Sequence, residues 1–298
     1  MPWIQLQIPA DPATADQLED LLMEMGADAV SMEDAADQPL YEPDPGTTPL
    51  WSDTRVTGLF DADRDIDQIC AELRDAWHRQ TQQALPEIDV SLVEDKDWER
   101  AWMDDFQPIR FGERLWIVPS WHDAPDPQAA NLLLDPGLAF GTGTHPTTAL
   151  CLEWLDGTDV TGQQIIDYGC GSGILGLAAL LLGADHVIGV DTDPQALEAS
   201  RDNAQRNGVA EDRLDLYLPG QDPETRADTL LANILAQPLI NLAVKLAGRV
   251  KPGGNLVLSG ILSSQAREVM TAYEPWFIMD EPAQREEWIR LTGRRIDR

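Results

Sequence analysis

The spacing of apolar residues in the first ninety or so positions predicts a small domain of strands and helices. Apolar runs and alternation predict strands over 3–8, 29–32, 56–60 and 88–93. Apolar residues at helical spacing predict one helix from about Thr14 to Gly26 and another from Ile66 to Trp77. Thr14 and Gln17 suit a capping box at the start of the first helix. The order β-α-β-β-α-β is the ferredoxin-like pattern, for which we favour a recognition role over a purely structural or oligomerising one.

The second half of the chain repeats a strand–helix rhythm. A strand over 165–168 leads into an apolar helix from Ile174, and the strands that follow are predicted over 187–190, 214–218, 229–233 and 256–258. The helices between and after them are predicted over 194–207, 239–246 and 263–273. This alternation predicts an α/β fold with a doubly wound, mostly parallel sheet. Ligands of such sheets bind at the carboxyl ends of the strands.

A polar segment over 94–106 joins the two halves. Its pattern predicts a connector helix whose Trp98, Trp102 and Phe106 pack between the domains, while a catalytic aromatic box is the alternative. Leu115–Val118 resembles a strand entering the second domain. The predicted organisation is therefore a recognition domain over 1–93, a connector helix and entry strand over 94–125, and a second domain over 126–298.

Charge narrows the range of partners. The 298 residues carry a formal charge of −31 and include only three lysines, Lys96, Lys245 and Lys251. We interpret this surface as an adaptation to a salty cytoplasm, while steering of a basic partner is a compatible alternative. Because no Lys/Arg cluster offers a footprint for phosphates, we expect no direct binding to nucleic acid.

Cysteine count and the first residues favour a reduced, cytoplasmic compartment. Cys70, Cys151 and Cys170 are an odd number at wide spacing, which argues against a disulfide framework and a cysteine-rich metal site. The chain begins without a basic region followed by an apolar segment, and no apolar run approaches the length of a membrane span. We expect no metal and no membrane contact.

The stretch over 165–175 carries the strongest chemical signal. Gly169, Gly171 and Gly173 follow a strand ending Asp167-Tyr168, and bare main chain there lets a ligand come close to the start of a helix. Gly171, Gly173 and Gly176 also match the G-x-G-x-x-G spacing of dinucleotide binders. The turn alone therefore predicts a nucleotide-like ligand without choosing one.

Acidic residues on either side of the glycine turn help to identify the ligand. Asp191 ends the next strand, where a carboxylate can accept hydrogen bonds from both hydroxyls of an adenosine ribose; capping of the following turn is the alternative. Asp167 lies two residues before the first glycine, where it would repel a pyrophosphate and favour the ammonium of S-adenosylmethionine. Together with Asn233, at the end of the 229–233 strand, these acids favour S-adenosylmethionine over NAD.

A Gly/Thr-rich segment, 135–148, lies just upstream. We predict a lid folded over the ligand, and a capped helix start without ligand contact is the alternative. Pro146 suits the first turn of the helix that follows. For His145 we favour a role in holding the loop over that of a catalytic base.

With these motifs the chain resembles the bacterial ribosomal protein L11 methyltransferase family (PrmA). The resemblance rests on Asp167-Tyr-Gly-Cys-Gly-Ser-Gly, Asp191, the 135–148 segment, Ala232-Asn-Ile-Leu-Ala and Glu94-Asp-Lys-Asp-Trp-Glu-Arg, and it extends along essentially the whole chain. It implies a Rossmann-like seven-stranded methyltransferase sheet and an N-terminal ferredoxin-like domain that holds the substrate. Gln237 stands where the family pattern suggests a glycine.

The resemblance also implies the chemistry. The cofactor would be S-adenosylmethionine, bound by Thr148, Gly169, Gly171, Asp191 and Asn233. The substrate would be the amino groups of ribosomal protein L11, at the base of the large-subunit stalk, and the enzyme a monomer. The alternatives are a methyltransferase of the same fold acting on another protein or a small molecule, a binding module without turnover and, more distantly, a nicotinamide dehydrogenase.

The residues after Asn233 concern the methyl acceptor. Methyltransferases of amide or adenine nitrogens carry Asn-Pro-Pro-Tyr or a relative at this strand end, whereas Ile234 and Leu235 follow here. An sp³ amine needs no planar clamp, because its lone pair is localised once it is deprotonated. Water or a weak acceptor could remove that proton, so we name no residue as the general base.

Overall fold

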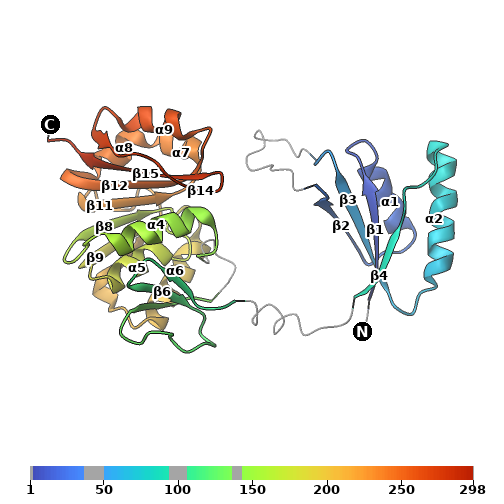
Figure 1. The fold of residues 1–298 in the computed structure, drawn as a ribbon, viewed down its shortest axis with the longest axis horizontal. Helices are drawn as coiled ribbons and strands as arrows, with labels where there is room; N and C mark the ends of the chain where they lie inside the picture. The colour runs from blue at the N-terminus through green and yellow to red at the C-terminus, as the bar shows by residue number, and fades with distance from the viewer. Residues whose placement is uncertain (1–2, 37–49, 94–105, 136–142, 298) are drawn as a thin grey trace. The chain divides into compact units, whose positions relative to one another are not determined.

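The computed structural model describes residues 3–36, 50–93, 106–135 and 143–297 and divides the chain into two compact units, Met1–Asp105 and Phe106–Arg298 (Figure 1). Each unit has its own hydrophobic core. Apart from Phe106, the predicted connector helix lies outside the described residues, as do positions 136–142 of the predicted lid.

Unit 1 has the predicted order of elements. They are β1 (Trp3–Ala10), α1 (Ala15–Glu24), β2 (Ala29–Asp34), β3 (Thr54–Asp61), α2 (Ile66–Thr81) and β4 (Asp89–Val93). The strands form an antiparallel sheet in the order β2-β3-β1-β4. Alternate apolar residues of β1 and β3, such as Leu6 and Phe60, share a core with Leu22 of α1 and Leu73 of α2.

The prediction of a capping box between Thr14 and Gln17 is wrong, because Thr14 bonds to Asp11 instead. The Thr14 side chain makes no capping hydrogen bond to α1. Its hydroxyl instead donates to the Asp11 carboxylate at 2.7 Å and accepts from the Asp11 N–H at 3.2 Å. The two residues therefore stabilise the turn before the helix, because Asp and Thr compete well for nearby main-chain groups.

Unit 2 is built on one large mixed sheet. Its principal strands, in sheet order, are β10 (Leu214–Tyr217), β9 (His186–Val190), β8 (Gln164–Tyr168), β11 (Ala227–Asn233), β12 (Val250–Leu262), β15 (Trp288–Arg295) and β13 (Phe277–Met279). The first five are parallel, whereas β13, β15 and the short β14 (Ala283–Arg285) are antiparallel to their neighbours. The order reverses between β8 and β11, and ligands of doubly wound sheets bind beside such a reversal, at the carboxyl ends of the strands.

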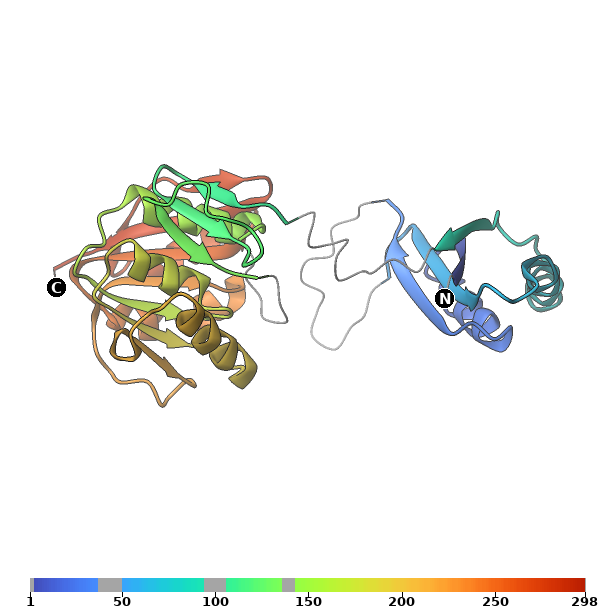
Figure 2. The same ribbon diagram turned by 90° about the horizontal axis from the view of Figure 1, so that it is seen from below.

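Helices cover both faces of this sheet (Figures 1 and 2). The helices are α4 (Pro146–Gly157), α5 (Ile174–Leu181), α6 (Pro194–Arg206), α7 (Ala236–Asn241), α8 (Ala243–Gly248) and α9 (Ala266–Tyr273), with a 3₁₀ turn at Glu211–Arg213. Residues of α4, α5 and α6 pack in one core, and residues of α7, α8 and α9 pack in the other. The single helix predicted over 239–246 is interrupted at Leu242, and the helix predicted from 263 begins at Ala266.

A small second sheet, β5-β6-β7, precedes α4 in unit 2. Its strands are β5 (Ile109–Phe111), β6 (Leu115–Val118) and β7 (Ala130–Leu133), of which only β6 is predicted from the pattern. The buried carboxylate of Asp156, in the last turn of α4, accepts hydrogen bonds from the N–H groups of Glu113 and Arg114, each at 2.7 Å. This carboxylate fastens the β5–β6 turn to α4.

The three cysteines are free and buried. Within the described ranges, no group of three or more His, Cys, Asp or Glu side chains is arranged to hold a metal ion. None of the helices in the described part of the chain combines the length and apolar character needed to cross a membrane.

Candidate functional site

The sequence-predicted residues of unit 2 come together where β8, β9 and β11 end. Asp167 of β8 lies beside Gly189 of β9 on one side and Leu231 of β11 on the other. Asp191 directly follows β9, and Asn233 is the last residue of β11. The parallel order thus brings residues far apart in sequence to one edge of the sheet.

Gly169, Gly171 and Gly173 form the turn between β8 and α5, all at positive φ. The Gly169 and Cys170 N–H groups donate to the Val190 carbonyl at 2.7 and 3.1 Å, which ties the turn to β9. A Cβ on Gly169 would lie 2.3 Å from Cγ2 of Ile234. The positive φ angles agree with the prediction for this turn, and close packing against Ile234 is a further reason for glycine at 169.

Gly176 has a packing role. It lies inside α5, where a Cβ would be 2.8 Å from Val187 of β9 and 3.2 Å from the Asp167 carboxylate. This contact lets α5 approach the sheet and explains the G-x-G-x-x-G spacing.

Two polar residues of α6 donate hydrogen bonds to the main chain of the glycine turn between β8 and α5. Neither was predicted from the sequence. The Ser200 hydroxyl donates to the Gly171 carbonyl at 2.8 Å, and the Asn203 amide donates to the Ser172 carbonyl at 2.9 Å. Both side chains are buried. Their spacing of three places them on the same helix face as buried Ala196 and Ala204, and polar residues in such a stripe are the signal that could have found them.

Asp191 is oriented by two backbone groups. Its Oδ2 accepts from the Gly171 N–H at 2.9 Å, and its Oδ1 accepts from the Asp193 N–H at 3.0 Å. The second of these bonds is the turn-capping contact weighed as an alternative. Each carboxylate oxygen has two lone pairs, so both oxygens of the half-buried Asp191 can accept a further hydrogen bond.

Asp167 is buried, which weakens the charge argument drawn from the sequence. Its side chain is buried against the start of α5, and Oδ2 accepts from the Gly176 N–H at 2.9 Å. Burial, with a smaller contribution from the nearby Asp191, raises the pKa of this carboxyl to about 7, against the lowering effect of the Gly176 hydrogen bond. A group that is substantially protonated near neutral pH repels a pyrophosphate weakly, so the charge argument against NAD loses force.

Thr148 and Asn233 meet across the site. Asn233 Nδ2 donates to Thr148 Oγ1 at 3.2 Å, which joins the end of β11 to the first turn of α4 although the residues are 85 positions apart. Asn233 Oδ1 is buried and has no hydrogen-bond partner among the described residues. A buried acceptor of this kind indicates a missing donor.

His145 serves as the N-cap of α4. Its Nδ1 accepts from the Thr147 N–H at 3.3 Å and lies 2.7 Å from the Thr147 hydroxyl, and its ring meets Trp288 edge-on at a centroid distance of 4.9 Å. Burial lowers the pKa of His145, although Glu286 and Glu287 oppose the shift. These contacts agree with the structural role favoured from the sequence.

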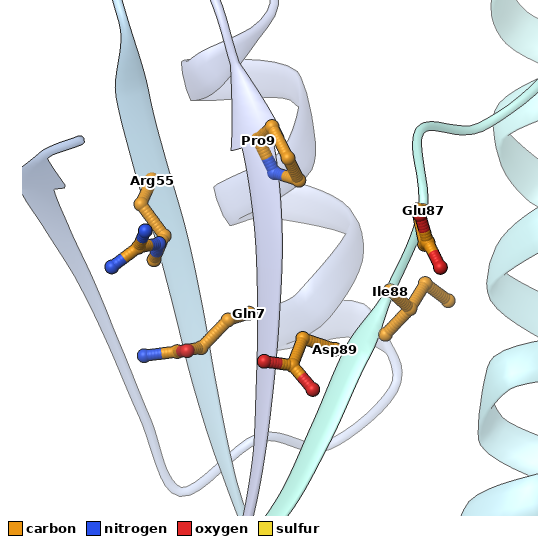
Figure 3. Close-up of a pocket in the computed structure, with 6 residues that line it drawn as sticks. All are labelled: Gln7, Pro9, Arg55, Glu87, Ile88 and Asp89. Atoms are coloured by element: carbon orange, nitrogen blue, oxygen red, sulfur yellow. The ribbon is translucent and has the colours of Figure 1, made fainter. Parts of the chain in front are cut away.

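A separate pocket of about 370 Å³ lies on the sheet of unit 1. Figure 3 shows its lining side chains on β1, β3 and β4 and in the segment before β4, on the side of the sheet away from α1: Gln7, Pro9, Arg55, Glu87, Ile88 and Asp89. These residues offer carboxylates but no nucleophile paired with a base. We therefore place the chemistry at the carboxyl edge of the sheet in unit 2.

Comparisons with known proteins cover the whole chain. Residues 2–296 match the family model described as ribosomal protein L11 methyltransferase (PrmA). The chain is 83% identical over 297 residues to a protein of that name from Marinobacter nauticus, with 100% of both chains covered. It is 59% identical over 295 residues to one from Pseudomonas aeruginosa, with 99% of both covered.

A solved structure of a similarly named protein also resembles this chain. The crystal structure of ribosomal protein L11 methylase from Lactobacillus delbrueckii subsp. bulgaricus is 32% identical and superposes with a TM-score of 0.59. The match covers 64% of this chain and 100% of that one.

Proposed function

The chain belongs to the ribosomal protein L11 methyltransferase family, and we propose that it transfers methyl groups from S-adenosylmethionine to amino groups of ribosomal protein L11. The relatives are named ribosomal protein L11 methyltransferase. The observation that carries the proposal is the convergence at one sheet edge of the Asp191–Gly171 contact and the Asn233–Thr148 contact.

The residues at this edge fit the cofactor. We assign its binding to Thr148, Gly169, Gly171, Asp191 and Asn233. Asp191 would accept from the two ribose hydroxyls, because its oxygens are oriented by backbone groups and retain free lone pairs. The bare Cα of Gly171 would allow close approach of the cofactor, and the buried Asn233 Oδ1 would gain a donor.

When bound, S-adenosylmethionine supplies a methyl group on a positively charged sulfur. The protein's task is then to hold the acceptor amine in line with that bond, since in-line displacement depends chiefly on positioning. A lysine amine has a pKa of about 10.4 and an α-amine about 8, so the acceptor must lose a proton first. His145 Nδ1 is engaged at the α4 N-cap, and we assign no general base.

The acceptor groups proposed are the α-amine and lysine ε-amines. Asn233 is followed by Ile234 and Leu235, and Leu235 is 49% exposed. This apolar turn lacks the aromatic face and prolines that hold a planar NH₂ group. An sp³ nitrogen does not need them.

We assign substrate recognition to the ferredoxin-like domain over 1–93, the connector helix and the strand that enters the second domain to 94–125, and catalysis to 126–298. This assignment is supported by the sequence, because the glycine turn, Asp191 and Asn233 all lie in the last of these segments. We further propose that the protein acts as a cytoplasmic monomer without direct contact with nucleic acid, in keeping with its formal charge of −31.

Incubation with purified, unmethylated ribosomal protein L11 and S-adenosylmethionine tests the proposal. Intact mass should rise in steps of about 14 Da, the mass of one methylene, and peptide mapping should place the groups on amines. An L11 mass that stays unchanged would contradict the assignment.

A further inference from the structure

The turn after β11 is held between Gly169, which directly follows β8, and Gly260 of β12. A Cβ on Gly169 would lie 2.3 Å from Cγ2 of Ile234, and a Cβ on Gly260 would lie 2.4 Å from the Ile234 carbonyl oxygen and 2.7 Å from its carbon. The side chain of Ile234 therefore packs on Gly169, and its main chain packs on Gly260. We call this arrangement the Ile234 seat.

Gly260 lies in a β-bulge beside the proposed cofactor site. Leu258 of β12 pairs with Leu291 of β15, whereas Ile261 pairs with Ile289, so the two residues between them on β12 face one on β15. Gly260 has φ +82°, a conformation that glycine adopts without strain. The preceding residue, Ser259, is the β12 partner of Asn233.

The contact at Gly260 involves main-chain atoms. A side chain can rotate away from a new methyl group, but the Ile234 carbonyl can move only if the chain from Asn233 to Leu235 moves with it. That displacement would alter the 3.2 Å contact between Asn233 Nδ2 and Thr148 Oγ1.

We propose that Gly260 is a positioning residue for methyl transfer. Its bare Cα leaves room for the main chain of Ile234, and this position of the chain lets the neighbouring Asn233 contact Thr148. Gly260 acts through this turn and needs no contact with either substrate. The inference rests on the proposed function, since it concerns the efficiency of that reaction.

Gly260→Ala tests the inference, and Gly253→Ala is a matched control. Gly253 lies in the same strand at φ +69°, but a Cβ there would meet no atom within 4 Å. Both variants impose the same kind of backbone strain, and only one crowds Ile234. With ribosomal protein L11 as substrate, we expect kcat of Gly260→Ala to fall about 100-fold below the control, as for a misplacement near 1 Å, with KM for L11 nearly unchanged.

Equal kcat values for the two variants would overturn the inference, and so would an increase in KM without a loss of kcat. The wild-type protein distinguishes this failure from that of the proposed function. If wild type transfers no methyl group, the proposed function fails. If wild type is active and both glycine variants match it, only the positioning role fails.

A second pair of variants covers the case in which Gly260→Ala does not fold. Ile234→Val keeps the Cγ2 methyl that packs on Gly169, whereas Ile234→Ala removes it. The Ile234 seat predicts near wild-type kcat for the valine variant and at least a tenfold loss for the alanine variant, with KM for L11 unchanged in both. Wild-type kcat in Ile234→Ala would contradict the seat.

Discussion

Asp167 and Asp191 end neighbouring strands of unit 2, yet they lie in different environments. Asp167 is 1% exposed and has one oxygen without a hydrogen-bond partner among the described residues, whereas both oxygens of the half-buried Asp191 accept backbone N–H groups. Burial disfavours the charged form of a carboxyl, and hydrogen-bond donors favour it. Asp191 is thus suited to accept hydrogen bonds from hydroxyl groups. Asp167, with its raised pKa, makes the stability of the fold depend on pH.

Asp167→Asn should change how stability depends on pH. The folded-state pKa of Asp167, about 7, lies above its ordinary value of 3.8. Between these values the folded state binds more protons than the unfolded state, so this group's contribution to the free energy of unfolding falls as pH rises and levels off above about 7. Without cofactor, the variant should gain stability relative to wild type from pH 4 to pH 8, on the order of a few kcal/mol.

Urea unfolding at each pH measures this difference, with Asp202→Asn, an exposed acid on α6, as the control. A difference between wild type and Asp167→Asn that stays constant with pH would show that Asp167 does not bind a proton in this range.

Thr148 should position Asn233 through its hydroxyl. Thr148→Val keeps the shape but removes the acceptor for Asn233 Nδ2, and a lost hydrogen bond of this kind costs about 1 kcal/mol. We expect the Kd for S-adenosylmethionine to rise about five- to tenfold, as measured by calorimetric titration. Thr148→Ser retains a hydroxyl and should bind nearly as wild type does, so equal losses in the two variants would count against this role.

Residues with local signals could be predicted from the sequence. Gly169 and Gly171 follow a strand directly, and Asp191 ends the next strand, so spacing alone locates them. Whether an acid is exposed or buried depends on packing, so the burial of Asp167 could not be predicted from its position in the sequence. Asn233 was placed at the site because it ends a strand, whereas Thr148, 85 positions away, was assigned to the cofactor only through the family resemblance.

At the scale of elements, long periodic segments were predicted well and short ones were missed. β13 and β14 have three residues each, too few to show alternation, and β15 carries four arginine and threonine residues among its eight. The sheet is consequently less parallel than predicted at its β13–β15 side. The β5–β6 turn depends on Asp156, 43 positions from Glu113, and no local pattern reveals such a contact.

Asp156→Ala should loosen the β5–β6 turn from α4. The change leaves the Glu113 and Arg114 N–H groups without their acceptor, and lost hydrogen bonds to a charged group cost about 1.5–3 kcal/mol. We expect the free energy of unfolding to fall by about 2 kcal/mol in urea titrations. Asp202→Ala removes the same charge from an exposed helix position, and a loss no larger than in this control would refute the anchoring role.

At the scale of the whole molecule, the formal charge of −31 is the dominant feature. Repulsion among surface acids acts over the Debye length, which shortens from about 30 Å in 0.01 M salt to about 3 Å in 1 M salt. The midpoint of thermal unfolding should therefore rise by a few degrees as NaCl increases over this range. A midpoint that is constant or falls would contradict adaptation to a salty environment.

Measuring kcat/KM over the same range of NaCl distinguishes electrostatic steering of the substrate from stabilisation of the fold. If acidic residues also attract a basic substrate, kcat/KM for L11 should fall as salt increases while the protein becomes more stable. A kcat/KM that does not fall would leave stability in salt as the sole role of the acidic surface.

The carboxyl edge of the sheet in unit 2 should bind S-adenosylmethionine, and calorimetric titrations with S-adenosylmethionine and with NAD test this binding. Wild type and the surface control Asp202→Ala should bind S-adenosylmethionine with equal affinity and show no preference for NAD. Asp191→Ala should bind S-adenosylmethionine at least about 100-fold more weakly, a loss of about 2.7 kcal/mol, because two oriented acceptors are removed. Unchanged affinity in Asp191→Ala, or preferential binding of NAD by wild type, would contradict the account.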